Sequence, residues 1–371
     1  MSRSLKIVAD ENMPNLHAQF ARWGEITALP GRNICAADLT GCDILLVRSV
    51  TRVDAALLAN SSVQFVGSAT IGTDHIDLEY LAAANIAFAH APGCNAASVE
   101  QYDFAAMVYL RPNWRQQRVG VLGGGNVGGR IATTLMALGV DVVVCDPFLD
   151  SVRVPWPLVR LEALLQCDII LLHAPLTESG AHPTHHLIGA SELALLKPNA
   201  LLLNAGRGAV IDNRALLDYL DTARGSDVVL DVWEQEPLVE AALLDKVALG
   251  TPHIAGYSLQ GRSNGTAMVA AALAQHLGES AVNSGQEGRL ETLAGVSDLN
   301  AAIAATYSVA ADDQRLRAAL LGQGGLDERR ALFDQLRRHY PARNEFSCYQ
   351  LSATDSSLRQ AAQQLGFQLN D

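Results

Sequence analysis

The chain has 371 residues, which is too long for one ordinary core, and we expect two or three domains. Hydrophobic residues make up 49% and charged residues 18%, a composition typical of a compact enzyme that argues against a disordered protein. The formal net charge of −12 disfavours nucleic acid as the main partner, although it leaves room for a locally positive pocket that binds an anionic small molecule.

The N-terminal stretch MSRSLKIVADENMP is a poor secretory signal, because its apolar part is short and Asp10 and Glu11 follow at once. No uninterrupted apolar run reaches membrane-spanning length. The cysteines form no C-x-x-C pair, and several lie inside apolar runs; they occupy positions 35, 42, 94, 145, 167 and 348. We therefore expect reduced, buried thiols in a cytoplasmic protein that has no membrane partner.

Short apolar runs alternate with helical stretches in the first part of the chain. Near-continuous Val, Ile and Leu runs indicate strands that are covered on both faces, and such strands form parallel sheets. Four runs are predicted strands, at 5–10, 43–50, 63–70 and 86–92. The stretch NLHAQFARWG is a plausible helix between the first two.

The same rhythm returns after residue 117. Six further strands are predicted, at 118–123, 140–147, 167–175, 200–206, 227–233 and 247–256. Strand–helix alternation in two blocks predicts two doubly wound α/β domains with parallel sheets, Rossmann-like or flavodoxin-like. Between the blocks, residues 91–114 contain a predicted connecting helix that ends at Arg111-Pro112, because proline blocks its continuation.

The character of the sequence changes past about residue 285. A helix is predicted over 299–322, and the stretch RRALFDQLRRHYPARNEFSCYQLSA completes what we interpret as a small α+β domain without a recognisable chemical motif. We expect a substrate-binding domain at 1–94, completed by about 257–284. A second α/β domain should span 95–256 and the small domain 285–371.

The stretch RVGVLGGGNVGGR carries the G-x-G-x-x-G pattern through Gly123, Gly125 and Gly128, after a strand and before a helix. The first glycine allows a tight turn, the second lets the backbone approach a pyrophosphate, and the third lets helix pack on strand. Asp146 ends the next strand, 18 residues past the last glycine, where a carboxylate accepts hydrogen bonds from a ribose diol. It would repel a 2′-phosphate, so NAD is favoured over NADP.

Charged residues follow three later strands. Arg207 lies in a sharp turn, where its planar guanidinium suits a carboxylate. Glu234 and Glu236 compete as the acid that orients an imidazole, and Asp231 could face the nicotinamide. A histidine between apolar neighbours is more often structural than catalytic, but His253 follows arginine and acid at successive strand ends beside a dinucleotide fold. We therefore predict that His253 carries a proton.

These motifs resemble those of the D-isomer-specific 2-hydroxyacid dehydrogenases over roughly residues 5–280. The matching stretches are VGVLGGGNVG, CDIILLHAPLT, LLKPNALLLNAGRGAVID, VVLDVWEQEPL and TPHIAG. Further stretches are similar to one branch of the family: VADENMP, LVRSVTRV, VGSATIGTDHID, APGCNA and PHIAGYSLQGRSNGT. That resemblance implies NAD-dependent oxidation of 4-phospho-D-erythronate at C2, in the route to pyridoxal phosphate. It also implies a homodimer that pairs through the C-terminal domain.

The resemblance implies a role for each matching residue. His253 would be the acid/base, Glu236 its partner, and Arg207 the group that holds the substrate carboxylate and C2 oxygen. Ser49, Thr70 and Tyr257 would contact substrate, and Arg48 is a further candidate for the phosphate by charge alone. The remaining cofactor contacts would come from Asn126, Val127, Asp146, Ala205, Gly206, Asp231 and Gly256, beside the three glycines.

Several alternatives stay open. The substrate could be another 2-hydroxy acid such as 3-phosphoglycerate or glycerate, or the protein could be a non-catalytic NAD-sensing protein like the corepressors of this fold.

His182, His185 and His186 form a cluster whose spacing lacks a companion acid, so we expect a solvated loop and no metal. The connecting segment departs from the family pattern at Glu100-Gln101-Tyr102 and is shorter, so the resemblance leaves its hinge geometry open but not the chemistry. The sequence leaves open whether NAD is released each turnover or is reoxidised in place by a 2-oxo acid.

Overall fold

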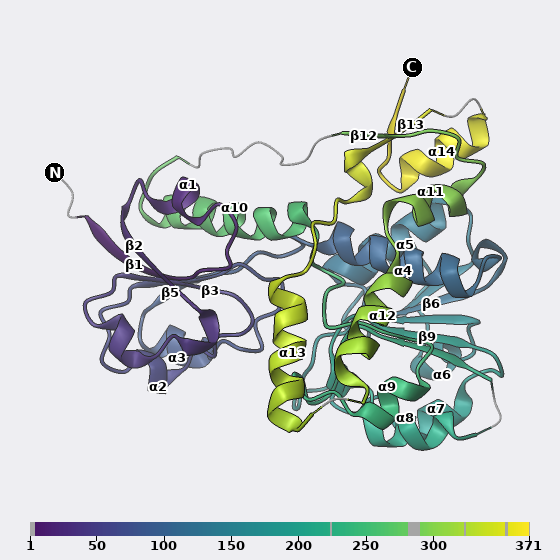
Figure 1. The fold of residues 1–371 in the computed structure, drawn as a ribbon, viewed down its shortest axis with the longest axis horizontal. Coiled ribbons are helices and arrows are strands. Elements are labelled where there is room, and N and C mark those ends of the chain that lie inside the picture. Colours follow the sequence, from purple (N-terminus) through teal and green to yellow (C-terminus); the bar gives the residue numbers. More distant parts are fainter. Residues whose placement is uncertain (1–3, 223–224, 281–289, 323, 353–354, 371) are drawn as a thin grey trace. The chain divides into compact units, whose positions relative to one another are not determined.

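The computed structural model describes all residues except 1–3, 223–224, 281–289, 323, 353–354 and 371 (Figure 1). The chain divides into two compact units. The first unit comprises Met1–Asn95 and Leu259–Gly288, and the second comprises Ala96–Ser258 and Arg289–Asp371. Each unit is built around a parallel sheet, so the predicted fold class of two parallel α/β sheets is confirmed.

The sheet of the first unit has the strand order β2-β1-β3-β4-β5, which is flavodoxin-like. Four strands lie in the predicted runs: β1 (Leu5–Asp10), β3 (Ile44–Val47), β4 (Phe65–Ser68) and β5 (Ala87–Ala89). The fifth strand, β2 (Gly24–Leu29), was not predicted. It lies at the sheet edge and is only partly buried, so its residues lack the continuous apolar run that marks a central strand.

Helices cover both faces of this sheet. Phe20 of α1 (Leu16–Phe20) and Val269 of α10 (Leu259–His276) pack with Ile7 on one face. Leu58 of α2 (Ala55–Leu58) and Leu81 of α3 (Leu78–Ala83) share a second cluster with strand residues of the opposite face. Polar residues stand at the carboxyl ends of three of these strands: Asp10 ends β1, Arg48 follows β3 and Thr70 comes two residues after β4.

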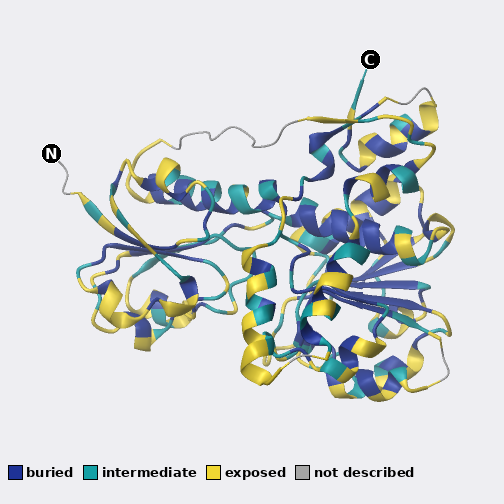
Figure 2. Cartoon of the chain, in the orientation of Figure 1, coloured by how far each residue is buried: buried dark blue, intermediate teal, exposed yellow. Residues whose placement is uncertain are grey.

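The second unit contains a six-stranded parallel sheet with the order β11-β10-β9-β8-β6-β7. All six strands fall in the predicted runs: β6 (Val119–Leu122), β7 (Val142–Cys145), β8 (Ile169–Leu172), β9 (Leu201–Asn204), β10 (Asp227–Leu230) and β11 (Leu249–Gly250). These strands are almost wholly buried (Figure 2). The chain adds β7 on one side of β6 and β8 on the other, so the strand order reverses at β6, where ligands bind in sheets of this kind.

The connecting helix α4 (Ala96–Leu110) ends at the predicted position, and the other helices that flank the sheet are α5 (Asn126–Ala137), α6 (Leu161–Leu164), α7 (Ala190–Leu195), α8 (Asn213–Leu220) and α9 (Ala241–Lys246). Short 3-10 turns occur at Gly31–Asn33, Ala36–Leu39, Trp114–Gln116, Gly208–Val210 and Phe346–Cys348. No helix in the described part of the chain is long and apolar enough to cross a membrane. The six cysteines, all of them among the described residues, form no disulfide, and only Cys35 is exposed.

The C-terminal segment forms a three-stranded parallel sheet, β12 (Glu291–Leu293), β13 (Tyr349–Leu351) and β14 (Gln368–Leu369), together with α11 (Leu299–Thr306), α12 (Val309–Leu320), α13 (Leu326–Arg338) and α14 (Ser356–Gln364). The prediction of one helix over 299–322 was wrong. Tyr307 is extended and ends α11, and the Ser308 side chain accepts a hydrogen bond from the Ala311 N–H to begin α12.

Candidate active site

The carboxyl edge of the six-stranded sheet gathers the polar residues that follow its strands. Gly123 follows β6, His173 follows β8, Arg207 lies in the turn after β9, and Asp231 follows β10. His253 comes three residues after β11. Parallel strands place all these residues at one edge, and that edge is where open α/β sheets bind ligands.

The three glycines of the turn after β6 meet three different constraints. Gly123 has a φ of +87°, a backbone conformation that residues with a Cβ rarely adopt. A Cβ on Gly128 would lie 1.9 Å from the Gly123 carbonyl oxygen, so helix α5 could not approach β6. A Cβ on Gly125 would meet no protein atom within 4 Å. The protein therefore does not need a glycine at 125 for its own packing, and that open backbone suits the close approach of a pyrophosphate.

Asp146 lies beside this turn. Its carboxylate accepts a hydrogen bond from the Gly124 N–H at 2.9 Å and from the Phe148 N–H at 3.0 Å. These two bonds hold the carboxylate at the mouth of the glycine turn. The glycine turn and the N-terminus of α5 together fit the pyrophosphate of a dinucleotide, and the carboxylate of Asp146 fits its ribose.

His253 and Glu236 form a hydrogen-bonded pair. The His253 Nδ1 lies 2.7 Å from the Glu236 Oε2. His253 itself has φ +57°, a left-handed conformation that costs about 1 kcal/mol or more for a residue with a side chain. Such backbone strain persists where the surroundings enforce it, and it is common at functional sites.

The surroundings that enforce this conformation centre on Asp231. Its buried carboxylate accepts hydrogen bonds from the Thr251 hydroxyl and from the N–H groups of Ile254 and Ala255. The His253 N–H donates to the Asp231 carbonyl at 2.7 Å. Burial raises the pKa of the Asp231 carboxyl, although the nearby His253 and these hydrogen bonds oppose that rise. Asp231 thus fixes the loop on which the imidazole stands.

Glu236 is held as the ionised form. Burial by itself would raise the pKa of Glu236, but the charges of His253 and Arg337 and the hydrogen bonds from His253 and the Trp233 N–H outweigh it. The pKa of Glu236 therefore lies below its ordinary value. An ionised carboxylate at Nδ1 orients the ring and stabilises its protonated form, which is the arrangement that general acid–base catalysis requires.

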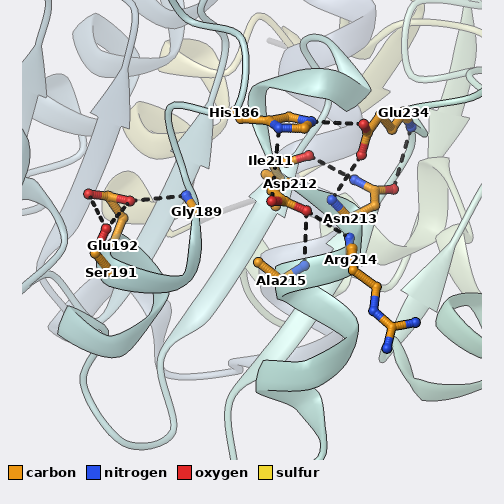
Figure 3. Close-up of polar contacts among 10 residues, drawn as sticks. All are labelled: His186, Gly189, Ser191, Glu192, Ile211, Asp212, Asn213, Arg214, Ala215 and Glu234. Atoms are coloured by element: carbon orange, nitrogen blue, oxygen red, sulfur yellow. Dashed lines mark hydrogen bonds and ion pairs between the residues drawn. The ribbon is translucent and has the colours of Figure 1, made fainter.

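Glu234, the competing candidate, pairs with a different histidine. Its Oε1 lies 2.8 Å from the His186 Nε2, and its Oε2 accepts from the Asn213 N–H at 3.0 Å (Figure 3). The ring of His185 stacks on that of His186 with centroids 4.0 Å apart. The expectation that the histidine cluster lacks a companion acid was therefore wrong. The acid is distant in sequence, and His182 instead contacts Phe148.

The Arg207 loop packs directly on the loop that carries Glu236. A Cβ on Gly208 would lie 2.0 Å from the Trp233 carbonyl carbon, so the two backbones are in contact. The Asn204 side chain ties the turn together, since it donates to the Arg207 carbonyl and accepts from the Gly206 N–H. Arg207, Glu236 and His253 thus lie on adjoining loops at the carboxyl edge of the six-stranded sheet.

Comparison with known proteins agrees with this geometry. The family model described as D-isomer specific 2-hydroxyacid dehydrogenase, NAD binding domain, matches residues 86–255, and a model for a domain of unknown function matches residues 286–366. An erythronate-4-phosphate dehydrogenase of Cellvibrio japonicus is 48% identical, with 98% of this chain and 99% of the relative covered. Another, of Marinomonas sp., is 41% identical over 99% of this chain and 100% of the relative.

The chain belongs to the D-isomer-specific 2-hydroxyacid dehydrogenase family. It is accordingly an NAD-dependent dehydrogenase, which confirms the prediction of class and cofactor. Its fold matches a 3-phosphoglycerate dehydrogenase of Entamoeba histolytica with a TM-score of 0.65, at 21% identity over 76% of this chain and 99% of the other. A D-lactate dehydrogenase of Aquifex aeolicus matches with a TM-score of 0.62, at 23% identity over 74% and 96%.

Two buried groups of the dehydrogenase were not anticipated from its sequence. The His173 Nε2 lies 2.7 Å from the Asp103 Oδ2, and both side chains are buried. Burial raises the pKa of Asp103, and His173 opposes that rise. The sequence does show a histidine directly after β8, but its acid lies in α4, 70 residues earlier, and no local spacing reveals the pair.

The C-terminal segment of the dehydrogenase also contacts the His253 loop. Arg343 donates from Nη2 to the carbonyls of Ile254 and Ala255 and to the Ser98 hydroxyl. The Ser258 hydroxyl donates to the Glu345 carboxylate at 2.6 Å. A segment without a recognisable motif therefore helps to fix the backbone that follows the predicted acid/base.

The predicted substrate residues of the first unit lie at the carboxyl ends of its strands. Arg48 donates from Nε to the buried carboxylate of Asp10 at 3.0 Å, so its charge has an internal partner. The Thr70 hydroxyl lies 2.7 Å from that of Ser68, and Ser49 is exposed. The substrate and cofactor contacts assigned to these and the other residues stay predictions.

The connecting segment places its unusual residues in the core of the second unit. Glu100 accepts from the Arg130 Nε and the Thr134 hydroxyl, and burial raises its pKa. The Tyr102 hydroxyl lies 2.8 Å from that of Thr251, which in turn donates to Asp231. Tyr102 is thereby linked through two hydrogen bonds to the residue that fixes the His253 loop.

Proposed function

We propose that this dehydrogenase oxidises 4-phospho-D-erythronate to (R)-3-hydroxy-2-oxo-4-phosphooxybutanoate with NAD, in the biosynthesis of pyridoxal 5′-phosphate. The hydrogen-bonded pair of His253 and Glu236 at the edge of a dinucleotide-binding sheet is the observation that carries the chemistry. The choice of substrate rests on relatives of 41–48% identity that are named erythronate-4-phosphate dehydrogenases and span nearly the whole chain.

In this proposal His253 removes the proton of the C2 hydroxyl. Glu236 occupies Nδ1, so Nε2 is the nitrogen that takes up the proton. The carboxylate then stabilises the imidazolium, and the loop bonds of Asp231 keep the ring in place. NAD, when bound, supplies the ring that accepts the hydride from C2. Gly123, Gly125, Asn126, Val127, Gly128, Asp146, Ala205, Gly206, Asp231 and Gly256 would hold that cofactor.

Arg207 would bind the substrate carboxylate and the C2 oxygen, because a guanidinium forms two parallel hydrogen bonds with a planar anion. Ser49, Thr70 and Tyr257 would make further substrate contacts, with Arg48 as an additional candidate. We further propose that residues 1–94 and about 257–284 bind the substrate and 95–256 bind NAD. The protein would act in the cytoplasm as a homodimer that pairs through 285–371. Light scattering on the full-length protein tests whether it is a dimer.

The decisive assay measures NADH formation with 4-phospho-D-erythronate, with a 2-oxo acid added as a possible acceptor. We expect turnover with this acid to exceed that with 3-phosphoglycerate or glycerate. Faster oxidation of one of those acids would reassign the substrate, and no hydride transfer to any of them would favour a non-catalytic NAD-sensing protein. The dependence of the steady state on the 2-oxo acid would show whether NAD is reoxidised in place.

A further inference from the structure

Arg337 stands at the end of α13 and is only 8% exposed. Helix α13 packs along α12 in the C-terminal segment, and its buried face carries Phe333 and, one turn later, Arg337 (Figure 1). The guanidinium carbon of Arg337 lies 5.4 Å from the centre of the Tyr257 ring. Tyr257 follows His253 by four residues on the same loop, and its N–H donates to the Ile254 carbonyl. The arginine therefore reaches the loop that carries the acid/base.

This guanidinium is buried without a counterion in contact. Among the residues that the structure describes, Arg337 forms no side-chain hydrogen bond and no ion pair, and its Nε is wholly buried without a partner. Arg317 of the neighbouring helix shows the usual alternative, because it pairs with Asp313 and binds the carbonyls of Leu244 and Val247. Burial by itself would lower the pKa of Arg337, but nearby negative charges, Glu236 among them, raise it overall, so the guanidinium stays charged although no carboxylate is bound to it.

A charged group that is buried without a bound partner is a candidate for a ligand site. The five N–H donors of arginine match a phosphate or a carboxylate, and stacking on a tyrosine ring holds the guanidinium plane in place. In the proposed function Arg207 already takes the substrate carboxylate, and Tyr257 already contacts substrate. The second anionic group of a phosphorylated 2-hydroxy acid is its phosphate.

We propose that Arg337 binds the phosphate of the substrate and thereby selects phosphorylated over unphosphorylated 2-hydroxy acids. The proposal rests on the proposed function for the identity of the acid. It gives the C-terminal segment a direct part in substrate choice.

A different role would be to act through Glu236. Arg337 is close enough for its charge to help lower the pKa of that carboxyl. An arginine that only served Glu236 would support catalysis on every substrate, whether or not the substrate carried a phosphate. The two roles therefore predict different results when Arg337 is substituted. A phosphate-binding role predicts a loss of activity on the phosphorylated acid alone, whereas a role through Glu236 predicts a loss on the phosphorylated and the unphosphorylated acid alike.

The experiment compares 4-phospho-D-erythronate with D-erythronate in full-length R337Q, R337K and R338Q. Arg338 is the exposed neighbour on the same helix and serves as the control. In R337Q we expect kcat/KM to fall at least about 30-fold for the phosphorylated acid, the usual effect of breaking a buried charge-assisted contact. It should change less than about threefold for D-erythronate. R337K should lose less, because it keeps the charge, and R338Q should match the wild type.

Thermal unfolding provides the second measurement. The Tm of R337Q should stay close to that of the wild type, because the Arg337 side chain makes no hydrogen bond or ion pair with the described residues and its attraction to Glu236 is offset by the cost of its burial. A clearly lower Tm would overturn the proposal by showing that the guanidinium serves packing. Equal losses on both acids, or no loss on either, would also overturn it.

If the wild type does not oxidise 4-phospho-D-erythronate, the proposed function fails. The binding of inorganic phosphate then tests the role of Arg337 independently of that function. Calorimetry would measure phosphate binding to the NAD complex of wild type and R337Q. A loss of at least about tenfold in affinity supports the assignment. Equal affinity refutes it.

Discussion

The two glutamates that follow β10 differ in the histidine that each one contacts. Glu236 binds the Nδ1 of His253, whereas Glu234 binds His186 and the first N–H of α8. Both are carboxylate–imidazole pairs of similar length, 2.7 and 2.8 Å. Only the first involves the histidine that we assign to proton transfer, so the two residues form a matched pair for mutagenesis.

We expect E236Q to lower kcat by about 100-fold, because the amide cannot stabilise the imidazolium, and general acid–base contributions are commonly of this size. E234Q should lower kcat less than about threefold. H253A should abolish most turnover while NAD binding, followed by fluorescence, survives in all three variants. A larger loss in E234Q than in E236Q would reverse the assignment of the two acids.

Glu236 also predicts a pH dependence of stability. Its pKa is below its ordinary value of about 4.3, so folding favours the ionised form. The resulting stabilisation is complete above the ordinary pKa and is lost as pH falls through the lower folded value. Urea unfolding of E236Q should therefore show a smaller loss of stability between about pH 5 and 3 than the wild type shows. An identical slope in the two proteins would contradict this prediction. The variant E328Q, at an exposed site on α13, is the control and should follow the wild-type curve.

Among single residues, the sequence singled out Arg207, the acids after β10 and His253 as candidates, because their types follow successive strands. The strand pattern by itself left Glu234 and Glu236 unresolved, since only the direction of each side chain separates them, and the choice of Glu236 came from the family resemblance. It gave no sign of Arg337, which lies among other arginines in RRALFDQLRRHYPAR and resembles a solvated helix face. Burial by a distant segment is a tertiary property that local composition does not encode.

The turn between β6 and α5 separates the demands of the fold from those of the cofactor. Gly128 is required by the packing of helix on strand, whereas Gly125 has open space in front of its Cα. G128A should therefore destabilise the protein by about 1–3 kcal/mol through overpacking. G125A should leave Tm nearly unchanged and weaken NAD binding at least about tenfold, because its methyl group would occupy the space that a pyrophosphate needs.

Calorimetric unfolding together with NAD titration measures both effects. Because each variant adds the same methyl group, the other variant is its control. If G125A binds NAD as the wild type does, the turn does not approach the cofactor as proposed. A Tm of G128A equal to that of the wild type would show that helix α5 can move away from β6 without cost.

The elements that the sequence predicted best are the central parallel strands. Runs such as DIILL and ALLLN are apolar at every position because both faces are covered, and β8 and β9 formed there. Strand β2 escaped prediction because an edge strand exposes half its residues. The break between α11 and α12 was missed because Thr306-Tyr307-Ser308 contains neither glycine nor proline, so only the extended conformation of Tyr307 reveals it.

For the molecule as a whole, the C-terminal segment shares its core with the NAD-binding part. Leu316 and Phe333 belong to one buried cluster with Trp233 and Leu244, and Ile303 belongs to another with Trp114. Contacts therefore unite Ala96–Ser258 with Arg289–Asp371 in one compact unit. The sequence suggested a boundary near 285 from a change of composition, and composition cannot show that two stretches pack on each other.

This shared core predicts that the C-terminal segment and the NAD-binding part unfold together. Phe333 is fully buried in the shared cluster, so F333A should destabilise the unit by about 3–5 kcal/mol. Leu326 lies on the same helix and is 57% exposed, so L326A should change stability by less than about 0.5 kcal/mol. Urea unfolding would be followed both by far-UV circular dichroism and by the loss of NAD binding. In F333A the midpoints of both transitions should shift together to lower urea concentrations, because removing the ring opens a cavity in the core that the two segments share.

If NAD binding kept its wild-type midpoint while part of the dichroism signal was lost at a lower urea concentration, the C-terminal segment would be an independent folding domain. The shared core would then be refuted.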